Sequence, residues 1–283
     1  MDVSVIVPFY KGNKYINNVL RMLKDNAENA MGVTIEAIVV NDSPEINIEI
    51  DTVLVEGYEL NVVEHKKNMG IQQARITGIS AARGEYVLML DQDDEIERNT
   101  IKSQYNMVKG KDAVVANGYS QNAAGEKFAL FKSPHQMEYV NNFPFFFYYG
   151  NVIASPGLCM IKKSLLPELW LSNIMVENGA DDWLLWVDFL NRGCKFVINE
   201  EYLYTHVNDG NNTSNDNNKM IKSSFEALCI VENSCQFNIK LLNVYRRRLH
   251  MRGHYISNNK IRKVMAYILN PDIAIQLIKY KFA

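Results

Sequence analysis

Residues 84–94 of this chain read GEYVLMLDQDD, and this stretch decides the fold class. Its five apolar residues YVLML are typical of a buried strand, and carboxylates follow at Asp91, Asp93 and Asp94. Carboxylates this close repel one another unless a cation lies among them, and such oxygen ligands suit Mg²⁺ or Mn²⁺ bridging to a phosphate. The alternative is a solvated acidic turn ahead of a predicted helix at 96–108. The stretch by itself leaves both interpretations open.

Apolar strands of the same kind recur through the first half of the chain. The predicted strands are 3–7, 35–40, 60–63 and 113–116, and helical spacing is clear at 16–23 and 71–82. Apolar strands that alternate with helices predict an α/β fold, with a Rossmann-like, mostly parallel sheet and helices on both faces. Ligands bind at the carboxyl ends of strands in such sheets, where Asp42 and the 91–94 cluster lie. We therefore expect one site that contains both.

The composition is that of an ordinary folded protein. Of 283 residues, 47% are hydrophobic and 22% are charged, which excludes a disordered or collagen-like chain. Lys and Arg number 30 against 32 Asp and Glu, so the net charge of −2 argues against a protein that coats nucleic acid. The most apolar stretch, 143–161, is interrupted by prolines and glycines and is interpreted as core and loop. The start, MDV, has no basic leader, so we expect a cytoplasmic protein.

The chain changes character after a polar loop at 208–218. A helical pattern continues from there to the end, so we predict a domain of residues 1–215 followed by a helical extension of residues 216–283. Between residues 240 and 283 of the sequence Lys and Arg are frequent, and Asp272 is the only acidic residue. This basic extension has three interpretations: a solvated helix face, a homodimer contact, or a surface that rests on the inner face of an anionic cell membrane. We favour the membrane.

The surroundings of the acidic cluster carry a more specific pattern. Residues 68–75 read NMGIQQAR and precede residues 84–94 at a fixed distance, residues 5–11 read VIVPFYK, and residues 39–43 read VVNDS. Together they resemble the signature of family 2 glycosyltransferases, which have the GT-A fold. The family usually has Asn where Lys11 stands, and Asp-Asp-Gly-Ser where this chain has Asn-Asp-Ser. The resemblance covers about the first two-thirds of the chain.

The resemblance implies that the strand ends bind a nucleotide-diphospho-sugar. Asp42 would accept a hydrogen bond from the uracil N–H, Asp91 would reach the ribose hydroxyls, and Asp93 would ligate Mn²⁺ or Mg²⁺ bridging the diphosphate. The residues that the resemblance assigns to nucleotide binding are Pro8, Phe9, Tyr10, Asp42, Asn68, Arg75, Asp91 and Gln92. Taken without the family motif, Tyr10 would be interpreted as a core aromatic residue and Arg75 as a charge on a helix surface.

A second acidic pair, Asp181-Asp182, resembles the family motif whose second residue is the catalytic base. An inverting transfer needs a carboxylate that removes the proton of the acceptor hydroxyl, and we assign this role to Asp182. The simpler interpretation is that one of the pair caps a helix, which is compatible with catalysis by the other. His206 matches a family histidine that in some members ligates the metal, although Thr205 stands where Arg is usual. An imidazole ligand suits Mn²⁺.

These features together predict an inverting, metal-dependent glycosyltransferase that moves one sugar from a UDP-sugar to a hydroxyl of a glycan or lipid-linked acceptor. The family's Q-x-x-R-W motif of processive members does not follow Trp186, which favours single additions. The family implies a role in bacterial surface polysaccharide or glycolipid synthesis. The alternative is a non-catalytic sugar-nucleotide-binding protein, which would need Asp91 and Asp93 but not Asp182. A nucleotidyltransferase would carry a Gly-rich basic loop after the first strand, which is missing here.

Overall fold

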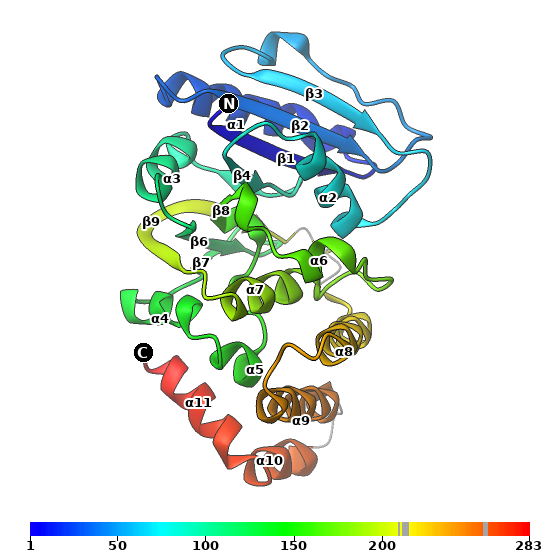
Figure 1. The fold of residues 1–283 in the computed structure, drawn as a ribbon, viewed down its shortest axis with the longest axis vertical. Coiled ribbons are helices and arrows are strands. Elements are labelled where there is room, and N and C mark those ends of the chain that lie inside the picture. Colours follow the sequence, from blue (N-terminus) through cyan, green and yellow to red (C-terminus); the bar gives the residue numbers. More distant parts are fainter. Residues whose placement is uncertain (209, 211–214, 257–259) are drawn as a thin grey trace. The chain divides into compact units, whose positions relative to one another are not determined.

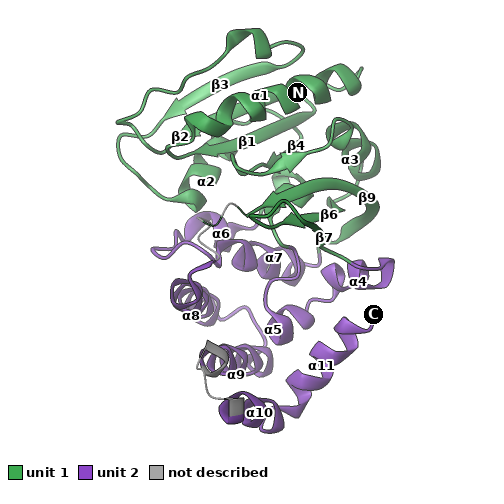
Figure 2. Ribbon diagram, turned by 180° about the vertical axis from the view of Figure 1, so that it is seen from behind, with its two compact units in different colours: residues 1–131, 154–166, 194–210 green, residues 132–153, 167–193, 211–283 purple. Residues whose placement is uncertain are grey.

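The computed structural model describes residues 1–208, 210, 215–256 and 260–283. These form two compact units (Figure 2). Unit 1 consists of residues 1–131, 154–166 and 194–210, and unit 2 of residues 132–153, 167–193 and 211–283. The prediction divides the chain once, at residue 215. The two units are not separated at one point, because unit 2 also contains residues 132–153 and 167–193.

Unit 1 is an α/β layer structure built on one sheet (Figure 1). Its strands are β1 (Val3–Phe9), β2 (Ile35–Asn41), β3 (Glu59–Glu64), β4 (Tyr86–Met89), β5 (Glu95–Ile96), β6 (Ala113–Gln121), β7 (Lys127–Ala129), β8 (Cys159–Lys162) and β9 (Phe196–Val207). Its helices are α1 (Asn13–Asn29), α2 (Ile71–Ala81) and α3 (Thr100–Val108), with a 3₁₀ turn at Thr52–Leu54.

The sheet has the strand order β3-β2-β1-β4-β8-β6-β9-β5, and β7 pairs with β6. The half from β3 to β4 is parallel throughout, and β6 runs parallel to β9. Strand β8 enters antiparallel between β4 and β6. The predicted parallel α/β sheet is therefore confirmed for the half that carries the acidic strand ends.

Burial explains why the N-terminal strands are apolar throughout. Every residue of β1 is buried, because helices cover both faces of the sheet around it. The connections β1-α1-β2 and β3-α2-β4 run in opposite directions along the sheet, so right-handed crossovers place α1 and α2 on opposite faces (Figures 1 and 2). Helix α2 lies so close to β1 that a Cβ on Gly78 would meet Cγ2 of Ile6 at 2.3 Å.

The helix predicted at 96–108 begins later than expected, at Thr100. Glu95 and Ile96 instead form the short strand β5, which pairs with Thr205 and Tyr204 of β9. This pairing could not be predicted from local sequence, because its partner lies more than 100 residues further along the chain. It places the residues that follow Asp93 against the end of β9.

Unit 2 is helical. Its helices are α4 (Pro134–Glu138), α5 (Phe145–Tyr149), α6 (Glu168–Ser172), α7 (Asp181–Asn191), α8 (Asn217–Asn233), α9 (Ile239–Ile256), α10 (Lys260–Ile268) and α11 (Pro271–Lys281). Aromatic side chains form its centre: the rings of Trp183 and Tyr245 stack 4.0 Å apart, and Phe147 meets Trp183 edge-on. Within the described ranges, no helix combines the length and hydropathy that crossing a membrane requires.

Candidate functional site

The parallel registers of β1, β2 and β4 bring three predicted site segments to one edge of the sheet. Phe9 pairs with Asn41 at the ends of β1 and β2, and Ile6 pairs with Met89 near the ends of β1 and β4. The backbone continues the pairing past the strands, since the Asp42 amide donates to the carbonyl of Phe9 at 2.8 Å. The segments that follow β1, β2 and β4 therefore lie at one edge of the sheet.

The loop after β1 is fixed by the side chain of Gln92. The Gln92 amide accepts from the Tyr10 N–H and donates to the Tyr10 carbonyl, both at 3.0 Å. A Cβ on Gly12 would lie 2.0 Å from Oε1 of Gln92, so a larger residue at this position would displace the Gln92 side chain from Tyr10. Tyr10 is 47% exposed and is not a core aromatic residue, whereas Pro8 and Phe9 are buried in β1. Of the three residues predicted to line the base and ribose, Tyr10 is the one with an exposed ring.

The two departures from the family motif, Lys11 and Asn41, differ in how well they suit the local structure. Asn41 Oδ1 accepts hydrogen bonds from the Ser43 N–H and hydroxyl, which closes a turn directly after β2. The Ser43 hydroxyl in turn accepts from the Lys11 N–H at 3.0 Å. Lys11 adopts a left-handed conformation with φ 51, which Asn adopts more readily than Lys. The usual family residue at this position therefore suits the local backbone better than the residue present.

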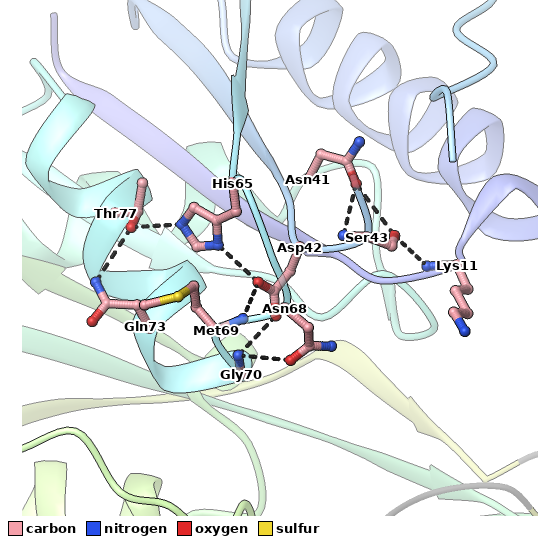
Figure 3. Close-up of polar contacts among 10 residues, drawn as sticks. All are labelled: Lys11, Asn41, Asp42, Ser43, His65, Asn68, Met69, Gly70, Gln73 and Thr77. Atoms are coloured by element: carbon pink, nitrogen blue, oxygen red, sulfur yellow. Dashed lines mark hydrogen bonds and ion pairs between the residues drawn. The ribbon is translucent and has the colours of Figure 1, made fainter. Parts of the chain in front are cut away.

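Asp42 is buried and its carboxylate binds the loop that leads into α2 (Figure 3). Oδ1 accepts from the Met69 N–H at 2.6 Å and lies 2.7 Å from His65 Nδ1, and Oδ2 accepts from the Gly70 N–H at 2.9 Å. Gly70 has φ 85, which only glycine adopts readily, and its N–H also donates to Asn68 Oδ1. Asp42 and Asn68 thus hold the start of α2. His65 is a site residue that the sequence analysis did not single out.

Arg75 and Asp91 form an ion pair. Arg75 Nη2 lies 2.7 Å from Asp91 Oδ1, and the side chains are 4% and 20% exposed. The interpretation of Arg75 as a surface charge is therefore wrong, because its place on α2 faces the end of β4. The pair fixes the orientation of the Asp91 carboxylate.

Asp94 is held by the end of β9. Its carboxylate accepts from the Tyr204 hydroxyl, from the Val207 N–H at 2.9 Å and from His206 Nδ1 at 3.0 Å. Burial raises the pKa of Asp94. The hydrogen bond that His206 donates to Asp94 raises the pKa of His206, although burial of the imidazole opposes this. A Cβ on Gly157 would lie 2.6 Å from the Tyr204 ring, so this glycine makes room for Tyr204.

Asp93 differs from its acidic neighbours. Asp91 is paired with Arg75 and Asp94 with Tyr204, His206 and Val207, but the Asp93 carboxylate forms no contact of this kind with another side chain in the described part of the chain. Burial, then the charges of Asp94 and Asp91, raise the pKa of Asp93 from 3.8 to about 6. Because burial and two neighbouring carboxylates outweigh the opposing charge of His206, a cation binds favourably beside Asp93.

The residues predicted to bind a metal fit one in part. Within the described residues no cluster of three or more His, Cys, Asp or Glu is arranged to hold an ion. Mg²⁺ and similar ions, however, commonly use one or two protein ligands and complete their shell with water and substrate phosphates. His206 donates through Nδ1 to Asp94, an arrangement typical of histidines that bind a metal through Nε2. Asp93 and His206 offer the two kinds of ligand atom that such ions use, a carboxylate oxygen and an imidazole nitrogen.

Asp181 and Asp182 lie in the first turn of α7, and the N-cap is Ala180, so neither carboxylate is the helix N-cap. Asp182 accepts from Asn151 Nδ2 at 2.6 Å and from the Trp183 N–H at 2.8 Å. A carboxylate at a helix N-terminus is stabilised by the helix dipole. Asn151 is a second residue that the sequence analysis missed, because it lies in a loop that carries no motif.

Comparison with known proteins identifies the family. The sequence profile described as "Glycosyl transferase family 2" matches residues 4–170, which is more than half of the chain. The chain belongs to glycosyl transferase family 2. The match includes every strand end described above except the end of β9.

Two curated relatives and one solved structure illustrate how this family 2 glycosyltransferase compares. It is 30% identical to "Glycosyltransferase GlyG" of Streptococcus pneumoniae serotype 4 over 218 residues, covering 72% of this chain and 70% of GlyG. It is 26% identical to "Poly(ribitol-phosphate) beta-N-acetylglucosaminyltransferase TarP" of Staphylococcus aureus over 216 residues, which cover 73% of this chain and 63% of TarP. It superposes on S. aureus TarS 1–349 with a TM-score of 0.60 at 18% sequence identity, and the superposition covers 92% of this chain and 74% of the TarS chain.

The TarS similarity establishes the GT-A fold, as predicted, with helices following the α/β core. Several relatives are longer than this glycosyltransferase. The chain spans about a third of the uncharacterized glycosyltransferase RC0461 of Rickettsia conorii, 35% of its length.

Proposed function

We propose that this glycosyltransferase moves a single sugar from a UDP-sugar to a hydroxyl group of a glycan or lipid-linked acceptor, with inversion at the anomeric carbon. The observation that supports this most directly is the arrangement at the ends of β1, β2 and β4. There a buried carboxylate, Asp42, lies at the start of α2, and an acidic cluster that includes Asp93 follows β4. The first suits a base N–H and the second a cation-bound diphosphate.

Each step of the proposed reaction uses a residue of the expected chemistry. Asp182 removes the proton from the acceptor hydroxyl, that oxygen forms a bond to the anomeric carbon, and the bond from this carbon to the diphosphate breaks, releasing UDP. The Asn151 side chain holds the Asp182 carboxylate through a 2.6 Å hydrogen bond. Asp93 and His206 would hold Mn²⁺ or Mg²⁺, which supplies positive charge for the departing diphosphate.

Relatives support the class of donor and of product. TarS has been crystallised with UDP-GlcNAc, and TarP is named a poly(ribitol-phosphate) N-acetylglucosaminyltransferase. We therefore propose a hexosyl- or N-acetylhexosaminyltransferase of bacterial surface glycan or glycolipid synthesis. The cytoplasmic location expected from the sequence is part of the same proposal.

The test is a panel of UDP-sugars with Mn²⁺ or Mg²⁺, read by release of UDP in the presence of candidate acceptors. Asp182→Asn should bind UDP as the parent protein does but lose activity by about 10²–10⁴-fold, the usual contribution of a general base. The alternative function, sugar-nucleotide binding without turnover, predicts that the parent protein binds UDP but releases none from any donor. Normal turnover by Asp182→Asn would show that the assigned base is wrong.

The surface of α10 and α11 supports the proposed peripheral membrane location. Exposed apolar side chains recur at helical spacing on both helices and just beyond: Ile261, Val264, Met265, Ile268, Leu269, Ile275, Ile278 and Phe282. Basic residues lie among them: Arg262, Lys263, Lys279 and Lys281. The nearby acid, Asp272, is neutralised by Arg247 at 2.5 Å. This combination fits an anionic lipid surface, and a homodimer through the same face is the competing outcome.

A further inference from the structure

Three side chains behind the proposed base site form a continuous chain of hydrogen bonds (Figure 3). His65 Nδ1 lies 2.7 Å from Asp42 Oδ1, and His65 Nε2 lies 2.9 Å from the Thr77 hydroxyl oxygen. His65 is 10% exposed and Asp42 is 5% exposed, so the contact between them is largely shielded from water, whereas Thr77 is half-buried. The three residues come from the end of β3, the end of β2 and the middle of α2.

The chain fixes the tautomer of His65. An ionised Asp42 carboxylate can only accept hydrogen bonds, so the imidazole proton must lie on Nδ1. In the neutral ring Nε2 is then an acceptor, and the Thr77 hydroxyl donates to it. Gln73 Nε2 lies 3.4 Å from the same hydroxyl oxygen and donates to it, which leaves the hydroxyl hydrogen free to point at His65.

The number of acceptor positions left on Asp42 decides what else the carboxylate can bind. A carboxylate has about four acceptor positions, two on each oxygen. His65 and the Met69 N–H occupy Oδ1, and the Gly70 N–H occupies one position on Oδ2. Among the residues that the structure describes, these three donors leave one acceptor position, and it lies on Oδ2.

A single remaining acceptor position distinguishes the nucleobases. Uracil offers one N–H at N3, flanked by carbonyl groups, and this matches one acceptor. Cytosine presents its N4 amino donor beside a lone pair at N3, so a carboxylate that accepts from the amino group is also repelled by N3. Guanine presents two neighbouring donors, N1–H and the N2 amino group, and pairs best with a carboxylate that has one free position on each oxygen. Oδ1 of Asp42 has none.

We propose that His65, anchored by Thr77, is a specificity-determining residue that restricts the base site to uracil by occupying Oδ1 of Asp42. It acts through Asp42 and is therefore a positioning residue. The inference rests on the proposed function, because it assumes that Asp42 receives the base of the donor nucleotide. It adds what the family resemblance does not contain: a residue between β3 and α2 that sets the choice between uracil and guanine.

The experiment measures binding of UDP, GDP and CDP to the full chain by calorimetry in the presence of Mg²⁺. His65→Ala should weaken UDP binding about tenfold, because the Asp42 carboxylate loses a charge-assisted hydrogen bond that orients Oδ2 for the uracil N–H. GDP binding should be retained or improved, so the ratio of UDP to GDP affinity falls at least tenfold, while CDP stays weak. A role confined to local folding would weaken all three nucleotides by the same factor.

Two variants and an added ligand make the test specific. His65→Asn places an amide N–H close to the position of Nδ1 and should restore the preference for UDP. Thr77→Val removes the anchor and should lower the ratio of UDP to GDP affinity about threefold, which keeps the test decisive if His65→Ala does not fold. His65 lines an open pocket of about 540 Å³, so added imidazole can enter and should partly restore UDP binding to His65→Ala.

The control is His135→Ala, which removes an exposed histidine whose Nδ1 also meets a carboxylate, that of Glu138 at 2.9 Å. It should change no nucleotide affinity. Equal losses for UDP, GDP and CDP in folded His65→Ala, or unchanged ratios in Thr77→Val, overturn the inference and leave the proposed function intact. A parent protein that binds no UDP, or an Asp42→Asn variant that binds UDP normally, overturns the assignment of the base site itself.

Discussion

Asp93→Asn should make the metal-free protein more stable while abolishing metal-dependent binding of UDP. The pKa of Asp93 is raised from 3.8 to about 6, mainly by burial and then by Asp94 and Asp91. At about 1.4 kcal/mol per tenfold change in the proton equilibrium, ionised Asp93 destabilises the fold by at most about 3 kcal/mol. Because the carboxyl is only partly buried, water screens it, and about 1–2 kcal/mol is the expected gain for Asn.

The sign of the pH dependence follows from the two pKa values. Between about pH 4 and pH 6 the folded protein keeps a proton on Asp93 that the unfolded chain releases. Raising the pH through this window therefore lowers stability, and the full loss persists at pH 7. Asp93→Asn should melt about 2–6 °C higher than the parent at pH 7, and the difference should vanish near pH 4.

The assay is thermal unfolding with a chelator at pH 4 and pH 7, repeated at pH 7 with Mn²⁺ and UDP. The ligands should raise the melting temperature of the parent protein and leave Asp93→Asn nearly unchanged. Asp25→Asn, at an exposed position of α1, is the matched control and should shift the melting temperature by less than about 1 °C. A less stable Asp93→Asn in chelator, or equal stabilisation of both proteins by Mn²⁺ and UDP, would refute the reasoning.

Three further results are expected. Glu36 is buried, and its pKa is lowered because hydrogen bonds from Ser4 and Arg83 outweigh the effect of burial. Glu36→Gln should lower the free energy of unfolding by about 2–3 kcal/mol, measured with urea at pH 7. The difference in this free energy from the parent protein should narrow as the pH falls below about 4.5, where the parent's carboxylate takes up a proton. Asn151→Ala should lower kcat about tenfold with unchanged UDP affinity, because the Asp182 carboxylate loses its side-chain donor. Replacing Ile268 by Asp should reduce sedimentation with vesicles rich in phosphatidylserine but not with neutral vesicles; a shift from dimer to monomer without any change in vesicle binding would favour the homodimer interpretation.

The fold class of unit 1 could be predicted from the sequence because its signal is local. A strand buried on both faces must be apolar along its whole length, and this pattern is visible in β1, β2 and β4 without knowledge of their neighbours. The acidic residues that follow two of these strands were predictable for the same reason, since a parallel sheet brings the carboxyl ends of its strands to one edge.

Only the tertiary structure decided how the individual side chains are used. From the sequence alone Arg75 is interpreted as a surface charge, but its position on helix α2 directs it toward Asp91. The side chain of Gln92 binds the backbone of Tyr10. His65 carries no motif and became visible only when β2, β3 and α2 placed it between Asp42 and Thr77. Hydrophobic periodicity is a property of each segment of the sequence, so the sequence by itself determined the architecture. Hydrogen bonds between residues far apart in the chain depend on the folded backbone, so only the tertiary structure determined which side chains pair with one another.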